Sequence, residues 1–151
     1  GLYLPVVTTE YRNIAAENFA GRAGLFQFTA AMAKEYGLAP SERTHVEKMA
    51  TAAAKYLRNR TAEFGADAKG MTLAMASLLR SPDRIKQDLR LLQRGNPNLE
   101  KSFWSLLENS KKLDQMFRNE DINYVPRFFA AAIIGENPQV FGLPMQPLST
   151  Y

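Results

Sequence analysis

Cysteine is absent from the sequence, and His45 is its only histidine. The absence of cysteine excludes disulfides, thiolate catalysis and cysteine-ligated metals within the 151 residues. A Ser-His-Asp triad would have to use His45, and a zinc site would have to be built almost entirely from carboxylates. We therefore expect neither a metal nor any other cofactor.

Long apolar runs are also lacking. The longest candidate, residues 128–134, is far shorter than the roughly 20 residues that span a bilayer, so no transmembrane helix is predicted. Because the first residue is Gly1 rather than methionine, we expect that a targeting segment has been removed. The formal net charge of +4 favours acidic partners, which include nucleic acid, anionic lipid and a wall polymer that carries carboxylates.

The apolar residues follow a helical period nearly throughout, and no stretch alternates apolar and polar residues as a half-buried strand does. This spacing predicts helices over residues 24–36, 71–79 and 124–136. Ser81 and Pro82 predict the start of another helix, which runs to Gly95. Together these patterns predict an all-α fold in a single domain over residues 1–151, with an irregular tail at 145–151.

The string AGRAGLFQF, residues 20–28, is the most informative local motif. Gly21 and Gly24 allow the backbone to approach another group closely, and the Gln27 amide can both donate and accept hydrogen bonds. The string is compatible with the lining of a binding cleft. Taken alone, it is more typical of a glycine-rich loop that packs tightly on a neighbouring helix and leaves Gln27 in solvent.

Further strings extend this motif in both directions along the chain. In order, the sequence reads LPVVTTEY, GRAGLFQFTAAMAKEYGL, ERTHVEKMATAAAKYLRNRTAEFG, LAMASLLRSPDRI, FW and NYVPRFFAAAIIGENPQVFGLP. This series, over about residues 4–144, resembles the lytic transglycosylases with the SLT, goose-lysozyme-like fold, and most closely their membrane-bound D-type branch. The resemblance implies a lysozyme-like helical domain of the bacterial periplasm or cell envelope, with peptidoglycan glycan strands as its partner.

In that family a single glutamate carries the chemistry. It protonates the glycosidic oxygen of peptidoglycan and then takes a proton from the 6-hydroxyl of the sugar, which gives a 1,6-anhydro product. Alignment on LP and Tyr11 places Thr8 at the glutamate and Thr9 at the serine that follows it, whereas counting back from Gln27 places Thr9 at the glutamate. A threonine hydroxyl is far too weak an acid for this step. Only an alignment with one residue deleted places Glu10 there.

The resemblance also implies a substrate groove lined by Gly21, Gly24, Gln27 and Tyr124, which match the family. Leu78 and Leu79 stand where the family has a tyrosine and an asparagine, so hydrocarbon replaces two polar groups of that groove. Losses in two separate motifs favour a domain whose catalytic motifs are degenerate.

Four functions follow as hypotheses. The leading one is a non-catalytic module, a pseudoenzyme, that binds peptidoglycan or an envelope protein. The first alternative is an active, divergent transglycosylase that uses Glu10 as general acid and base. A minor alternative is a basic helical module for nucleic acid, supported only by the charge and by Arg84, Lys86, Arg90 and Arg94. The last is a structural part of a larger envelope assembly.

Overall fold

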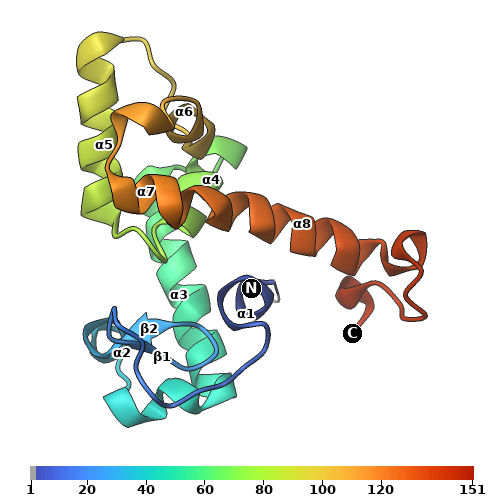
Figure 1. Ribbon diagram of the computed structural model, residues 1–151. Coiled ribbons are helices and arrows are strands. Elements are labelled where there is room, and N and C mark those ends of the chain that lie inside the picture. Colours follow the sequence, from blue (N-terminus) through green and yellow to red (C-terminus); the bar gives the residue numbers. More distant parts are fainter. Residues whose placement is uncertain (1–2) are drawn as a thin grey trace. The chain divides into compact units, whose positions relative to one another are not determined.

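The computed structural model describes residues 3–151, and these form helices with one small sheet (Figure 1). The α-helices are α1 (Leu4–Thr9), α2 (Ala30–Glu35), α3 (Val46–Phe64), α4 (Ala68–Ala76), α5 (Pro82–Gly95), α6 (Phe103–Glu108), α7 (Gln115–Asn119) and α8 (Tyr124–Glu136). Short 3-10 helices lie at η1 (Pro40–Thr44), η2 (Ser110–Lys112), η3 (Asp121–Asn123), η4 (Pro138–Phe141) and η5 (Leu148–Thr150), and the strands are β1 (Arg22–Ala23) and β2 (Phe28–Thr29). The predicted all-α class is therefore confirmed.

The chain divides into two compact units, whose boundaries fall within α3 and α8. Unit 1 comprises Gly1–Tyr56 and Arg127–Tyr151, and unit 2 comprises Leu57–Pro126. Each unit is described by itself below. The organisation of residues 1–151 as one domain stays a prediction.

The sheet of unit 1 interrupts the helix that was predicted over residues 24–36. β1 and β2 pair antiparallel, with Ala23 opposite Phe28, and α2 begins only at Ala30. Gly24 and Gln27 both have positive φ, which turns the chain back between the strands and cannot occur within a right-handed helix. Thr29 then caps α2, because its hydroxyl accepts a hydrogen bond from the Met32 N–H at 3.2 Å. The prediction of a helix from residue 24 was wrong for this reason, although its stop at Gly37 is correct within two residues.

Aromatic rings form the centre of unit 1. Phe28 is fully buried, and its ring lies edge-on to those of Tyr36 and Tyr56 at centroid distances of 6.2 and 5.8 Å. Such edge-to-face pairs add about 0.5–1.5 kcal/mol each beyond the area that they bury. The rings thereby fix β2, α2 and α3 to one another and hold the loop between the strands in place.

Tyr3, at the start of α1, joins this helix to the part of α8 that belongs to unit 1. Its ring lies edge-on to Phe128 at 5.9 Å, and its hydroxyl donates a hydrogen bond to the Glu136 carboxylate. Burial, and then this bond to an anion, raise the pKa of Tyr3 to about 12. A methyl group added at Gly135 would lie 2.6 Å from the Tyr3 ring, so glycine is needed for this approach.

In unit 2, α4 packs against both α5 and α6. Ile85, Leu89 and Leu92 form the buried stripe of α5, and its bounds, Pro82–Gly95, agree with the prediction. α8 also has the predicted bounds. α4 ends at Ala76, three residues earlier than predicted, and a turn leads to Ser81, whose position before Pro82 disfavours a continuous helix. Within residues 3–151, no helix combines the length and apolarity needed to cross a membrane.

Candidate functional site

The last turn of α1 carries Thr8 and Thr9, the two threonines that the resemblance placed near the position of the family's glutamate. The Thr8 hydroxyl lies 2.8 Å from the carbonyl oxygen of Leu4 and 3.1 Å from that of Leu25. The Thr9 hydroxyl lies 3.1 Å from the carbonyl oxygen of Pro5 and 3.5 Å from that of Leu25. Both hydroxyls therefore act as donors to the backbone, and they connect α1 to the loop between β1 and β2.

Glu10 follows these threonines in a left-handed conformation. It is the C-terminal cap of α1 at φ 51°, and Tyr11 has φ 62°. Two consecutive non-glycine residues in this region are uncommon, and they redirect the chain at the end of the helix. The Glu10 side chain is 77% exposed, and its Oε2 lies 2.8 Å from Nη2 of Arg12. Glu10 is thus a solvated carboxylate that pairs with a neighbouring cation.

The amide of Gln27 is used within the loop that contains it. Its Nε2 donates to the carbonyl oxygen of Gly24 at 3.0 Å, and its Oε1 accepts from Nδ2 of Asn18 at 3.1 Å. The Asn18 side-chain oxygen in turn accepts hydrogen bonds from the backbone N–H groups of Ala20 and Arg22. Gln27 is half-buried and lies before α2, not on its first turn as the predicted helix implied. The Gln27 amide is therefore hydrogen-bonded within the loop and is not left in solvent.

Gly24 and Gly21 differ in what they contribute to the loop. Gly24 has φ +71°, and a methyl group there would lie 1.8 Å from the carbonyl oxygen of Arg43. Gly21 has φ +68°, but its methyl position meets no atom within 4 Å among the described residues. Close packing therefore requires glycine at position 24, whereas only backbone conformation favours it at position 21.

Arg43 is a buried cation that binds backbone carbonyl oxygens at both ends of the same loop. Its Nη1 donates to the carbonyl oxygens of Gly21 at 3.1 Å and Phe28 at 3.3 Å, and its Nη2 lies 2.6 Å from Oε1 of Glu17. A buried guanidinium requires such partners, because desolvation of an unpaired charge costs several kcal/mol. Glu17, the second carboxylate near the loop, is thus committed to a structural ion pair.

The remaining predicted positions belong to unit 2. Leu78 and Tyr124 are buried, with 4% and 3% of their surfaces exposed, and Leu79 is half-buried. Leu78 and Leu79 follow α4 in the turn before α5, and Tyr124 opens α8. The structure therefore brings Thr8, Thr9 and the Gln27 loop together in unit 1, and it places the other three residues in the core or at the edge of unit 2.

Unit 2 contains a buried ionic cluster around Arg80. Its guanidinium lies 2.5 Å from Asp88, 2.6 Å from Asp114 and 2.8 Å from Asp121, and 5.3 Å from the centre of the Phe117 ring. Burial opposes the charged guanidinium, but the three carboxylates outweigh it and hold the pKa of Arg80 above its ordinary value.

The carboxylates of this cluster respond differently to their surroundings. The hydrogen bond from Arg80 holds the pKa of Asp114 well below its ordinary range, with help from Arg84 and the Phe117 N–H. Burial raises the pKa of Asp121, and Arg80 offsets this effect only in part. The cluster fixes the turn after α4 to α5, α7 and η3, and its role is structural.

Sequence reasoning missed the polar residues that build these arrangements, namely Asn13, Asn18, Arg43 and Arg80. Asn13 donates to the carbonyl oxygen of Thr44 at 2.6 Å and accepts from the Leu25 N–H at 3.0 Å. Arg80 lies between the helices predicted over residues 71–79 and from Ser81 onward, so no helix pattern singled it out. The concentration of asparagine and glycine in residues 13–24 was the available signal for a hydrogen-bonded loop.

No group of histidine, aspartate and glutamate side chains within residues 3–151 is arranged to hold a metal ion.

Comparison with known families gives one result. Residues 11–78 match the model of the family described as the Transglycosylase SLT domain. A search of curated proteins found no match to the chain. The matched residues include the glycine-rich loop, α2, α3 and α4, and they begin one residue after Glu10. Residues 11–78 thus match a lytic transglycosylase-like SLT domain, a type of domain related to peptidoglycan, and the helical architecture agrees with its lysozyme-like fold.

Proposed function

We propose that this domain has lost catalysis and acts as a peptidoglycan-binding or protein-binding module in the bacterial periplasm or cell envelope. The observation that carries the proposal is the environment of Glu10. A carboxyl that protonates a glycosidic oxygen must keep its proton near neutral pH, which requires a desolvated and apolar setting. Glu10 is instead exposed and lies beside the Arg12 guanidinium.

The two threonines give further support. Their hydroxyls point to backbone carbonyl oxygens of α1 and of Leu25, so each is engaged in local structure. Neither hydroxyl can replace a carboxyl as an acid at neutral pH. The buried Leu78 is apolar at a position where the resemblance implies a polar side chain of the substrate groove. A second polar group that the family uses at this groove is thus missing.

What persists is the framework of the loop. Gly24, Gln27 and Asn18 keep a defined hydrogen-bonded arrangement, with positive φ at Gly24 and Gln27. A rigid loop of this kind suits recognition of a polymer, because little conformational entropy is lost on binding.

The test is incubation of the protein with purified peptidoglycan, followed by sedimentation of the insoluble polymer and mass spectrometry of the soluble fraction. We expect the protein to sediment with peptidoglycan and the soluble fraction to contain no anhydro-muropeptides. If the protein stays in solution while an envelope protein is retained on it from an extract, the partner is a protein. Release of anhydro-muropeptides contradicts the proposal.

One observation favours the alternative of an active enzyme. Glu10, Tyr11 and Gln27 are non-glycine residues with positive φ, and strained backbone of this kind often accompanies functional sites. The change of direction at Glu10 is the local rearrangement that a displaced catalytic glutamate would need. Under this alternative, Glu10→Gln abolishes the release of anhydro-muropeptides without unfolding the protein, and a variant that retains the activity excludes Glu10.

A further inference from the structure

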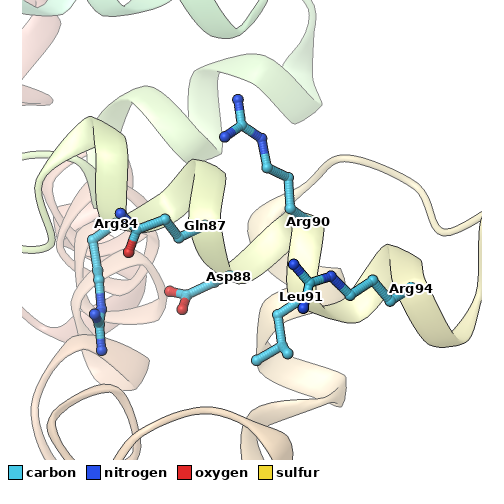
Figure 2. Close-up of a pocket in the computed structure, with 6 residues that line it drawn as sticks. All are labelled: Arg84, Gln87, Asp88, Arg90, Leu91 and Arg94. Carbon is cyan, nitrogen blue, oxygen red and sulfur yellow. The ribbon is translucent and has the colours of Figure 1, made fainter.

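The exposed face of α5 carries several charged side chains. A pocket of about 340 Å³ lies along it, lined by Arg84, Gln87, Asp88, Arg90, Leu91 and Arg94 (Figure 2). In Figure 2 the side chains of Arg84 and Arg90 leave the helix in opposite directions, and Arg94 extends along the helix toward Leu91. The pocket lies wholly within unit 2, and neither the chemistry of the family nor the proposed function assigns a role to it.

The cationic groups of this pocket are not neutralised equally. Asp88, the only acid in the lining, is 2.5 Å from Arg80 and so is compensated from inside. Arg84 shares Asp114 with Arg80 and has a side chain that is 51% exposed. Arg90 and Arg94 are exposed, and within residues 3–151 no carboxylate forms an ion pair with either of them. The pocket therefore presents an excess of positive charge and of guanidinium donors.

An apolar group lies among these charges. Leu91 is 48% exposed on the same face as Arg94, and Gln87 adds an amide that can donate and accept. Guanidinium groups bind carboxylates through paired N–H donors, and an exposed leucine side chain favours a ligand with methyl groups beside its charges. A phosphate backbone offers no methyl groups for such an apolar contact with Leu91.

We propose that this pocket of α5 binds the peptide stems of peptidoglycan, short peptides that carry free carboxylates next to alanine methyl groups. This inference rests on the proposed function, since it assumes that peptidoglycan is the partner. Arg90 and Arg94 supply the donors for stem carboxylates, and Leu91 supplies the apolar contact. A volume of about 340 Å³ suits a small part of a ligand, such as one or two residues of the stem, rather than a folded segment.

The matched variants remove the same charge at different places in unit 2. The double variant Arg90→Gln, Arg94→Gln removes two cations from the pocket. The control, Arg58→Gln, Arg118→Gln, removes two exposed cations that do not line it. Both variants replace exposed residues and leave the Arg80 cluster and the glycine-rich loop unchanged.

Two binding measurements then separate this inference from the proposed function. Isothermal titration calorimetry with a synthetic stem tetrapeptide tests the pocket, and sedimentation with glycan strands stripped of peptides tests the glycan. We expect the pocket variant to bind the tetrapeptide about tenfold more weakly than the control variant, and amidation of the peptide carboxylates to weaken binding of the native protein similarly. Raised salt should also weaken it.

The opposite results have distinct meanings. If both double variants bind the tetrapeptide equally, or if the native protein binds no tetrapeptide, the inference about α5 is wrong, whereas binding to stripped glycan strands would leave the proposed function standing. If the native protein binds the tetrapeptide but sediments with neither whole nor stripped peptidoglycan, peptidoglycan is not its partner, and the assignment of the pocket to peptidoglycan stems is wrong as well. Tight binding of duplex DNA that the pocket variant alone loses overturns the peptide assignment in favour of nucleic acid.

Discussion

Glu10 and Arg12 form an ion pair at the end of α1, with 2.8 Å between Oε2 and Nη2 and with both side chains largely exposed. Exposed pairs of this kind contribute little to folding, typically at most about 1 kcal/mol. Glu10 can therefore be replaced without loss of the fold, which makes it a clean probe of catalysis. Other residues stabilise the surrounding loop, and we make a separate prediction for each of them.

Thr8 should contribute to stability through its hydroxyl. Thr8→Val keeps the shape of the side chain but removes the donor to the carbonyl oxygens of Leu4 and Leu25. We expect the free energy of unfolding to fall by about 1 kcal/mol, measured by urea denaturation. Thr51→Val is the control, since Thr51 is exposed and its hydroxyl bonds only to the Glu47 carbonyl oxygen within α3. An equal effect of the two substitutions would contradict a special role for Thr8.

Gly24 and Gly21 separate close packing from backbone conformation. Gly24→Ala places a methyl group 1.8 Å from the Arg43 carbonyl oxygen at a position with φ +71°, so we expect a loss of several kcal/mol or failure to fold. Gly21→Ala meets only the conformational cost of its positive φ, about 1–2 kcal/mol. Thermal unfolding followed by circular dichroism gives both values. A Gly24→Ala protein as stable as Gly21→Ala would show that the loop does not pack on η1.

Arg80 should be among the most sensitive positions of unit 2. Arg80→Met leaves the buried carboxylates of Asp88 and Asp121 without their cation, and such a change costs about 3–5 kcal/mol. Arg84→Met is the matched control, because Arg84 is half-exposed and pairs only with Asp114, so a loss below about 1 kcal/mol is expected. Urea midpoints that shift equally for both variants would refute the structural role of the Arg80 cluster.

The same cluster predicts how stability depends on pH. The folded state holds the pKa of Asp114 below its unfolded value of about 4, so its contribution is present above that pH and is lost as the pH falls further. The raised pKa of Asp121 acts in the opposite sense, since protonation of that carboxyl favours the folded state, but the shift of Asp114 is the larger. Stability should therefore fall between about pH 4 and pH 2.

Asp114→Asn tests this assignment, because asparagine can still cap α7 as Asp114 does through the Phe117 N–H at 2.8 Å. The variant should be less stable than the native protein at pH 6. Its free energy of unfolding should also change less between pH 6 and pH 3 than that of the native protein does. Asp83→Asn removes an exposed carboxylate and should leave the pH dependence unchanged. An Asp114→Asn protein with the native pH dependence would assign the acid sensitivity to other groups.

The helical architecture could be predicted from the sequence where apolar periodicity and end signals agree. α5 and α8 have the predicted bounds because Pro82 starts one helix and the apolar period of residues 124–136 has no competing turn signal. Residues 24–29 misled the prediction, since an apolar run with helical spacing lies in a β-turn-β segment there. The positive φ of Gln27 depends on hydrogen bonds from Asn18 and to Gly24, which no local propensity reveals.

The candidate site was predictable only in part, for a similar reason. The family resemblance located Thr8, Thr9 and Gln27, but the direction of a side chain at a helix end depends on the cap. Glu10 adopts a left-handed conformation. The direction of its side chain therefore cannot be calculated from the rotation of about 100° that separates successive residues of an α-helix. Asn13 and Arg43 act through contacts between residues far apart in sequence, and their roles follow from tertiary structure. Asn18 acts within its own loop, through hydrogen bonds with Arg22 and Gln27.

The most direct test of the central claim is digestion of purified peptidoglycan by the native protein and by Glu10→Gln, with 1,6-anhydro-muropeptides counted by mass spectrometry. The account predicts that neither protein releases them and that both sediment with the polymer to the same extent. Release by the native protein that Glu10→Gln abolishes, with its fold intact by circular dichroism, would contradict the claim and identify Glu10 as a working catalytic acid.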